Sequence, residues 1–275
     1  MTIGFFDSGI GGLTVLHQVL KLMPQEDYLF YADTDHVPYG EKTKEEVRAY
    51  ILQAVEFIAR QDITALVIAC NTATSIVIEE LRSRYTFPVL GIEPAVKPAV
   101  EQSEGQQQRV LVLATRLTLQ EKKYHDLVHR IDPGERVDSL PLPGLVQYAE
   151  QFEFREEKII PYLQKELAHL NLARYSTVVL GCTHFPYFED SLRKVFPPGV
   201  KFISGSRGTA RHLKQLLGTK GEINQGTGNI RYYRSGVEVD DSALLSKYDG
   251  LFKRLDVMEA AAADIPDRSS EGEFI

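Results

Sequence analysis

The chain has 275 residues, of which 43 % are apolar and 25 % are charged, proportions typical of a folded soluble protein. Its formal net charge of -7 and the lack of a Lys/Arg run argue against nucleic acid as the main partner, because binding phosphates requires a basic surface. No apolar run reaches the roughly 20 residues that cross a bilayer, and no basic segment precedes an apolar one at the N-terminus. We therefore expect a cytoplasmic protein that binds a small molecule and no membrane.

Short apolar runs alternate with amphipathic stretches of helical length along the chain. Continuous runs rich in Val, Ile and Leu are typical of parallel strands covered on both faces. They lie at residues 3–6, 28–32, 65–69, 89–92, 110–114, 137–140, 177–180 and 201–203. The amphipathic stretches cover about 12–21, 44–61, 75–84, 119–130, 155–170, 188–195 and 208–217. This alternation predicts an α/β fold built from βαβ units with mainly parallel sheets.

Two segments of the chain look like copies of one another. In each, an apolar strand ends at a cysteine and a helical stretch follows: Cys70 comes after the strand at 65–69, and Cys182 comes after the strand at 177–180. The copies predict two pseudo-symmetric α/β lobes.

The boundaries of these lobes follow from the positions of the two copies. We assign residues 1–96 and about 206–257 to the first lobe, and residues 97–205 to the second. The polar 219–230 stretch reads as a flexible connection. The acidic, small-residue segment 258–275 predicts a flexible tail.

Polar and titratable residues follow the predicted strands of both halves. Ligands of open α/β sheets bind at the carboxyl ends of the strands, where the sequence places Asp7, Ser8, Cys70, Asn71, Thr72, Thr115, Cys182, Thr183 and His184. Two such edges that face each other enclose one site. We therefore predict an active site in the cleft between the lobes.

The two cysteines are too few for a disulfide scaffold and lack the clustering of a zinc site, so we expect no metal. A single cysteine at such a position is most often a small buried apolar residue. Here both cysteines begin a helix, where backbone amides and the helix dipole lower the pKa of a thiol. A racemase needs two acid–base groups on opposite faces of one carbon, whereas a cysteine hydrolase needs one nucleophile. The matched pair favours a racemase over a hydrolase.

Two titratable residues near the cysteines have both a possible catalytic role and a possible structural role. Asp7 and His184 are candidate acid–base assistants of Cys70 and Cys182. Alternatively, Asp7 caps a tight glycine-rich turn, and His184 bonds the backbone where its helix starts.

Cap-type residues stand beside both cysteines, and nothing marks a cofactor site. Asn71, Thr72 and Thr183 are typical of helix starts and also suit a substrate carboxylate. The segment 9–12 matches neither a dinucleotide nor a phosphate-binding loop, and no Lys is marked as a Schiff base. We expect no cofactor.

Four motifs resemble those of the glutamate racemases, cofactor-independent enzymes of the aspartate/glutamate racemase superfamily. In chain order they are IGFFDSGIGGLTV at 3–15, DTDHVPYG at 33–40, VIACNTA at 67–73 and VLGCTHFP at 179–186. The resemblance runs from residue 3 to about residue 217. It implies interconversion of L- and D-glutamate, with D-glutamate used in peptidoglycan synthesis and hence in cell wall biogenesis and cell shape.

The resemblance also implies roles for particular residues. Cys70 and Cys182 would be proton donor and acceptor and exchange roles with direction, assisted by Asp7 and His184. Substrate contacts are implied for Asp7, Ser8, Tyr39, Gly40, Asn71, Thr72, Thr118, Thr183 and His184. Glu150 loosely matches a carboxylate near the catalytic histidine, and a homodimer is the candidate assembly.

Four positions depart from common patterns of that family. This chain has His36 where the family commonly has Arg, and Leu117 where it has Gly. It has Leu142 where the family commonly has Cys, and Ser204 where it has Asp. None removes a proposed catalytic group. A racemase of aspartate or another small amino acid, and a non-catalytic amino acid binding protein of the same fold, remain as alternatives.

Overall fold

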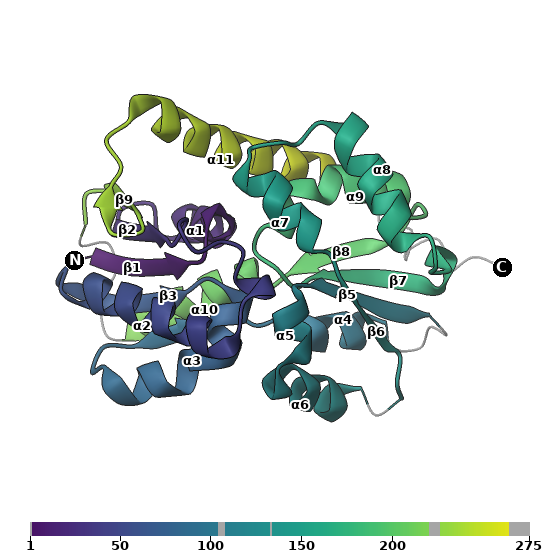
Figure 1. Cartoon of the computed structure of the whole chain (residues 1–275), viewed down its shortest axis with the longest axis horizontal. Coiled ribbons are helices and arrows are strands. Elements are labelled where there is room, and N and C mark those ends of the chain that lie inside the picture. Colours follow the sequence, from purple (N-terminus) through teal and green to yellow (C-terminus); the bar gives the residue numbers. More distant parts are fainter. Residues whose placement is uncertain (1, 104–107, 133, 220–225, 264–275) are drawn as a thin grey trace.

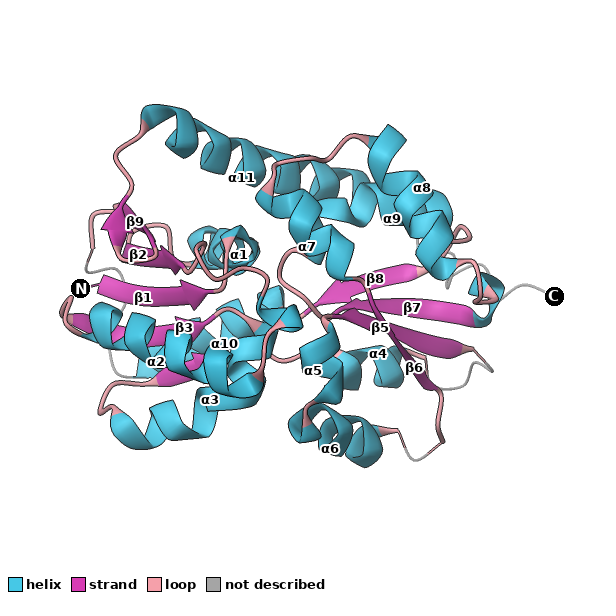
Figure 2. Cartoon of the chain, in the orientation of Figure 1, coloured by secondary structure: helices cyan, strands magenta, loops and turns pink. Residues whose placement is uncertain are grey.

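Two β-sheets lie next to each other, each flanked by helices, in the computed structural model of residues 2–103, 108–132, 134–219 and 226–263 (Figures 1 and 2). The first sheet has the order β10-β9-β2-β1-β3-β4, and the second β6-β5-β7-β8. The strands of the first are β1 (Thr2–Asp7), β2 (Asp27–Ala32), β3 (Ile63–Ile68), β4 (Val89–Gly91), β9 (Ile230–Arg234) and β10 (Val237–Glu238). Those of the second are β5 (Arg109–Ala114), β6 (Val137–Pro141), β7 (Tyr175–Leu180) and β8 (Lys201–Ser204).

The two sheets repeat one topology. β1 pairs in parallel with β2 and β3, and β3 pairs with β4; β5 likewise pairs with β6 and β7, and β7 with β8. Cys70 and Cys182 therefore follow equivalent strands, β3 and β7. The prediction of two α/β lobes with mainly parallel sheets is confirmed.

Strand alternation explains how helices cover both faces of the first sheet. In β1, Phe5 points into one apolar cluster and Phe6 into another, because successive strand side chains alternate between faces. The cluster around Phe5 includes residues of α1 (Leu13–Leu22), α10 (Ser206–Thr219) and α11 (Ser242–Ala263). The cluster around Phe6 includes residues of α2 (Lys44–Ala59) and α3 (Asn71–Arg84).

The second sheet is covered in the same way. Leu111 and Leu113 of β5 pack with α7 (Pro143–Glu150), α8 (Glu156–Leu167) and α9 (Glu189–Val195). Val110 and Val112 pack with α4 (Val96–Gln102) and α6 (Lys122–Ile131). The cluster of Leu111 is the same one that contains Phe5, so one continuous apolar core joins the lobes on that side.

All eight expected strands are present, but β9 and β10 were not predicted. β9 is half-buried and has Arg at two of its five positions, so no continuous apolar run marks it. The expected helix at 119–130 is two helices, α5 (Arg116–Gln120) and α6, and α4, α7 and α11 were not predicted. The described 3₁₀ turns are η1 (Ile10–Gly12), η2 (Tyr39–Glu41), η3 (Leu172–Arg174) and η4 (Phe185–Phe188).

After β8 the chain returns to the first sheet. α10 packs against α1, and β9 pairs in parallel with β2. α11 then crosses both lobes (Figure 1). The division at residues 96/97 and 205/206 stays a prediction, and residues 220–225 of the expected flexible connection lie outside the described residues.

The predicted tail needs one correction at its start. Residues 258–263 belong to α11, where Met258 packs against the core and Glu259 forms an ion pair with Lys21. Residues 258–263 are therefore helical and not a flexible segment, because Glu259 is paired with α1 and Met258 packs in the core. Residues 264–275 of the expected tail lie outside the described residues.

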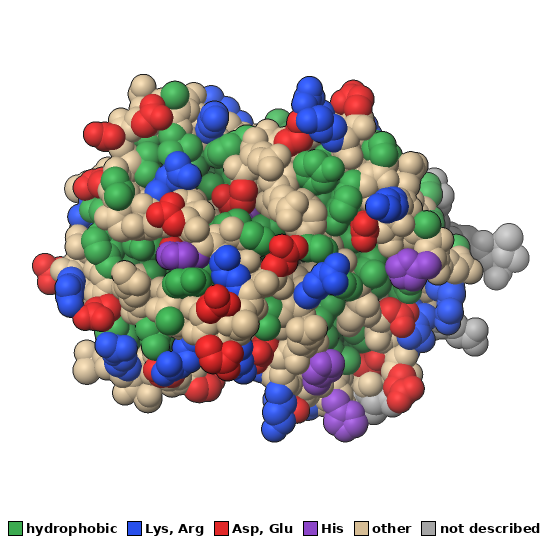
Figure 3. Space-filling view, in the orientation of Figure 1, with side chains coloured by type: hydrophobic (Ala, Val, Ile, Leu, Met, Phe, Trp, Pro, Cys, Tyr) green, Lys and Arg blue, Asp and Glu red, His purple; other side chains and the backbone are tan. Residues whose placement is uncertain are grey.

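Two further observations concern surfaces. Within the described ranges, no helix is long and apolar enough to cross a bilayer. On the face drawn in Figure 3, acidic and basic side chains of the described residues are interspersed, and neither lobe carries a broad patch of one sign.

Candidate active site

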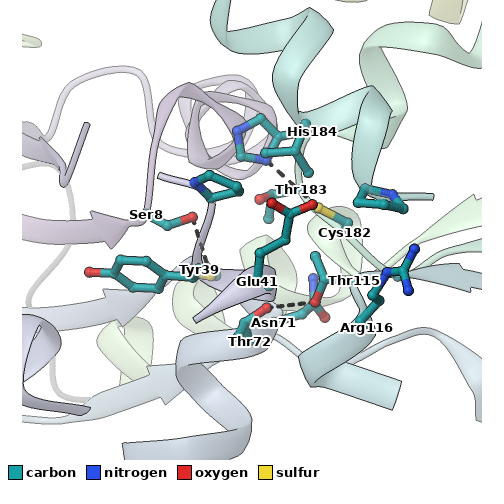
Figure 4. Close-up of a pocket in the computed structure, with 16 residues that line it drawn as sticks. Ser8, Tyr39, Glu41, Asn71, Thr72, Thr115, Arg116, Cys182, Thr183 and His184 are labelled. Atoms are coloured by element: carbon teal, nitrogen blue, oxygen red, sulfur yellow. Dashed lines mark hydrogen bonds between the residues drawn. The ribbon is translucent and has the colours of Figure 1, made fainter. Parts of the chain in front are cut away.

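A pocket with an empty volume of about 450 Å³ lies between the two lobes (Figure 4). Its walls are the segments that follow β1, β2 and β3 in the first lobe and β5, β6 and β7 in the second. It is lined by Ser8, Pro38, Tyr39, Gly40, Glu41, Cys70, Asn71, Thr72, Thr115, Arg116, Pro143, Val146, Gly181, Cys182, Thr183 and His184. Both cysteines therefore open into one pocket from opposite lobes.

Nine predicted site residues line this pocket, and two lie behind its wall. Asp7 and Thr118 are buried and are not among the lining residues. Thr118 Oγ1 lies 2.9 Å from Thr72 Oγ1 and 2.8 Å from Thr115 Oγ1. The distance between Thr72 Oγ1 and Thr115 Oγ1 is 2.9 Å. This triangle of hydroxyl groups joins α3 of the first lobe to α5 of the second.

Cys70 caps the N-terminus of α3 and is buried. Its Sγ accepts a hydrogen bond from the Ala73 amide at 3.5 Å and donates to Ser8 Oγ at 3.7 Å. Burial raises the pKa of the Cys70 thiol above its ordinary value, and the charge of Asp7 adds to this. The sequence predicted a lowered pKa; that prediction is wrong for Cys70, because one amide does not offset the loss of solvent around a thiolate. Cys70 is thus suited to be the acid.

Cys182 stands at the end of a relay through a histidine to a carboxylate. Its Sγ lies 3.7 Å from His184 Nδ1, and His184 Nε2 lies 2.7 Å from Glu150 Oε1. Burial lowers the pKa of His184, but the hydrogen bonds with Cys182 and Glu150 outweigh burial and raise the pKa well above its ordinary value. A histidine that contacts Cys182 on one side and Glu150 on the other can take the proton of the thiol and return it. Cys182 is thus suited to be the base.

Asp7 ends β1 behind the pocket and links the two lobes. Its Oδ2 accepts hydrogen bonds from the Gly12 amide and, at 3.3 Å, from Thr183 Oγ1. Burial raises the pKa of Asp7 to about 6, while the charge of His184 and the bond from Gly12 act in the opposite direction. A carboxyl group with this pKa can exchange a proton near neutral pH.

The glycine-rich turn after Asp7 allows the lobes to approach closely. A Cβ at Gly11 would lie 2.4 Å from His184 Nδ1, and a Cβ at Gly9 would lie 1.9 Å from Glu150 Oε1. Any other residue at either position would displace the histidine or its carboxylate partner. The sequence suggested two alternatives for this segment, a tight turn capped by Asp7 or a part of the active site. In the structure the segment is a tight turn that also packs against the active-site residues His184 and Glu150.

Sequence reasoning missed several pocket residues. Glu41 and Arg116 are exposed and line the pocket from opposite lobes, but nothing in their local sequence marks them. Glu150 is the last residue of α7; it was matched only loosely, because its contact with His184 depends on how α7 packs against η4. Among the described residues, no cluster of three or more His, Cys, Asp or Glu could hold a metal ion.

The four positions that depart from the family pattern lie outside the described lining of the pocket. His36 stacks on Tyr50 and bonds Asp33, and Leu117 and Leu142 are buried in apolar clusters. Ser204 ends β8. None of the four therefore changes a residue of the described wall of the pocket.

Asp7→Asn is expected to increase stability at neutral pH. Since the native pKa of Asp7 is about 6, above its unfolded value of 3.8, the native state binds more protons in this window, and stability falls as pH rises through it. Asparagine removes this loss, so the free energy of unfolding at pH 7 should exceed that of the parent by about 1–3 kcal/mol, with a smaller gain at pH 4. Urea unfolding at both pH values measures the difference.

The exposed Asp126→Asn is the matched control, for which we expect no pH-dependent gain. An Asp7→Asn protein that is less stable than the parent at pH 7, with an unchanged pH profile, would contradict the argument.

Two thiols that open into one pocket from opposite lobes, each with its own titratable neighbour, are suited to moving protons at two faces of one carbon, as a racemase requires. Residues 14–213 match the family described as Asp/Glu/Hydantoin racemase. Glutamate racemase 2 of Bacillus subtilis (strain 168) is 56 % identical over 256 residues, which cover 93 % of this chain and 97 % of that protein. The chain belongs to the Asp/Glu/Hydantoin racemase family, and the prediction of an amino acid racemase is confirmed.

Solved structures agree with this assignment. Glutamate racemase from Francisella tularensis subsp. tularensis SCHU S4 in complex with D-glutamate has a TM-score of 0.77 at 26 % identity, covering 92 % of this chain and 93 % of that one. The Escherichia coli glutamate racemase in complex with L-glutamate and the activator UDP-MurNAc-ala has a TM-score of 0.77 at 28 % identity, covering 90 % and 94 %.

Proposed function

We propose that this protein is a glutamate racemase that interconverts L- and D-glutamate without a cofactor, with Cys70 and Cys182 as its two acid–base groups. The observation that carries the proposal is the placement of the two cysteines at equivalent strand ends, on opposite sides of one pocket. The choice of glutamate is supported by the relatives, which include a glutamate racemase 56 % identical to this chain. Structures similar to this one bind L-glutamate and D-glutamate.

The proposed reaction moves one proton off the α-carbon and another onto it. In one direction the Cys182 thiolate, paired with the His184 imidazolium, removes the α-proton, and the bonding electrons stay on the carbon. The Cys70 thiol then gives its proton to the opposite face, which inverts the configuration. The reverse direction exchanges the roles, and Asp7, with a pKa of about 6, assists proton exchange at Cys70.

The carboxylates of the substrate would be held by hydrogen-bond donors at helix starts. α3 begins at Asn71 and Thr72 beside Cys70, and its backbone amides point toward the pocket end of the helix. Such amides, together with the helix dipole, bind anions well. The hydroxyl groups of Thr72 and Thr115 already bond each other, and that of Thr183 donates to Asp7. Ser8, Tyr39 and Gly40 complete the lining of the pocket.

The cellular role that we propose is the supply of D-glutamate for peptidoglycan synthesis, in the cytoplasm. A homodimer is the proposed assembly. Both follow from the resemblance to glutamate racemases, and neither depends on the geometry of the pocket.

The assay of choice offers L-glutamate and L-aspartate separately to the purified protein without pyridoxal phosphate, and follows the fraction of each D-enantiomer by chiral chromatography. We expect D-glutamate to accumulate to half of the total, since the enantiomers are equally stable, and L-aspartate to react far more slowly. If L-aspartate reacts faster than L-glutamate, the substrate is aspartate and not glutamate. Binding of both amino acids without reaction of either would favour a non-catalytic binding protein.

A further inference from the structure

α11 lies outside the family match at residues 14–213 and yet reaches the back of the active site. It crosses both lobes (Figure 1) and contacts α1 and η4. η4 directly follows His184. A helix that contributes nothing to the described pocket lining is therefore in contact with the turn that carries a proposed catalytic residue.

Arg254 makes the contact between α11 and η4. Its Nε donates to the Tyr187 carbonyl at 2.8 Å, its Nη2 donates to Asp190 Oδ2 at 2.6 Å, and its guanidinium lies 4.8 Å from the ring centre of Phe154. One side chain thus joins α11 to η4, to α9 and to the segment that follows Glu150.

The turn held by Arg254 is part of a closed circuit of hydrogen bonds around His184. The Tyr187 amide donates to the His184 carbonyl at 3.3 Å, and the Tyr187 hydroxyl donates to the Ile10 carbonyl at 2.9 Å. The Ile10 amide donates to Glu150 Oε1 at 2.8 Å, and that oxygen lies 2.7 Å from His184 Nε2. A displacement of Tyr187 would therefore move both ends of the His184–Glu150 contact.

The other side of α11 is fixed to the first lobe close to Arg254. Asp256 Oδ1 lies 2.8 Å from His17 Nε2 and 2.9 Å from Lys21 Nζ, and Glu259 lies 2.7 Å from Lys21 Nζ. His17 and Lys21 belong to α1, which starts right after the turn that binds Asp7. These ion pairs fix α11 to α1 close to Arg254, so Arg254 can hold η4 in place.

We propose that Arg254 is a positioning residue for His184, which keeps the imidazole in place between Cys182 and Glu150 by fixing η4 from α11. The inference rests on the proposed racemase function. Arg254 is not among the pocket-lining residues, so it would act on proton transfer and not on substrate binding.

The test uses Arg254→Met, which keeps the length and apolar packing of the side chain but removes both hydrogen bonds. Because a misplaced catalytic group slows a reaction steeply, we expect kcat/KM to fall by roughly tenfold, through kcat and not KM. The primary isotope effect with α-deuterated glutamate should grow for one enantiomer only. This should be the same enantiomer whose isotope effect grows in His184→Asn, because both changes slow proton removal by Cys182. Arg254→Lys, which keeps the charge and a donor, should recover part of the rate.

Arg193→Met is the matched control. Arg193 lies on α9, the helix that also carries Asp190, pairs with Glu189 and stacks on Phe202. Since neither contact reaches η4, its loss should leave kcat unchanged. An Arg254→Met protein that folds and keeps its rate within twofold would overturn the proposal. A loss of rate with equal isotope effects for both enantiomers and no recovery in Arg254→Lys would overturn it as well.

A measurement without substrate separates this proposal from the racemase assignment. The groups that face the His184 ring are Cys182, Glu150 and the carboxylate of Asp7. In ¹⁵N-histidine-labelled protein, the ring signals of His184, assigned with His184→Asn, should move and titrate at lower pH in Arg254→Met. Unchanged signals would overturn the positioning role even in an active enzyme, and changed signals would support it even if the parent did not racemise glutamate.

Discussion

Replacement of either cysteine by serine is expected to abolish racemisation of glutamate in both directions. A serine hydroxyl does not become a base at neutral pH, and each thiol serves as base in one direction and acid in the other. Loss of one acid–base group lowers kcat by about 10²- to 10⁴-fold, whichever cysteine is changed. Initial rates from L- and D-glutamate, measured by circular dichroism, test this in Cys70→Ser and Cys182→Ser.

Binding and folding provide the controls for the serine variants. Serine has the same branching as cysteine, and each thiol already has a polar partner that a hydroxyl can bond, Ser8 for Cys70 and His184 for Cys182. The unfolding midpoint and the affinity for glutamate should therefore stay close to those of the parent. Near-normal turnover by either variant would rule out the two-thiol mechanism. A loss of rate that tracks unfolding would leave no catalytic role for that cysteine.

His184→Asn has the second largest expected effect and should reveal which enantiomer Cys182 acts on. Asparagine cannot carry the positive charge that the bonds with Cys182 and Glu150 favour on His184, so proton removal by Cys182 slows. We expect kcat/KM to fall by about 10²-fold. Because the enantiomers have equal free energy, kcat/KM must fall equally in both directions, and the asymmetry appears in the primary isotope effect.

That asymmetry is the decisive readout for His184. α-Deuterated L- and D-glutamate are compared, and the isotope effect should grow only for the enantiomer from which Cys182 takes the proton. His212→Asn, an exposed histidine on α10, should change nothing. Equal isotope effects for both enantiomers in His184→Asn would contradict the pairing of His184 with one thiol.

Continuous apolar runs were sufficient to predict the central strands, because buried parallel strands need apolar side chains on both faces. β9 could not be predicted in this way, since this partly buried strand has Arg at two of its five positions and so contains no continuous apolar run. α11 was missed because few of its described side chains are buried, namely Tyr248, Leu251 and Leu255, and its role depends on contacts with α1 and η4. Local patterns predicted the two lobes, whereas long-range packing decides what holds them together.

In the candidate site, too, local sequence patterns predicted some features and long-range packing determines the others. The positions of Cys70 and Cys182 at strand ends were predictable from their flanking sequence, and both line the pocket. The raised pKa of Cys70 was not, because it depends on burial and on the nearby charge of Asp7. The contact between Glu150 and His184 joins residues of separate helices, and no local sequence pattern records it.

The destination of solvent deuterium tests the two-thiol account most directly. L-Glutamate is incubated with the protein in heavy water without pyridoxal phosphate, and the α-proton signal of each enantiomer is followed by NMR and chiral separation at early times. Two thiols on opposite faces predict that newly formed D-glutamate carries deuterium at the α-carbon while the remaining L-glutamate keeps its proton. Deuterium that enters L-glutamate as fast as D-glutamate forms would contradict the account, because it would mean that one group serves both faces.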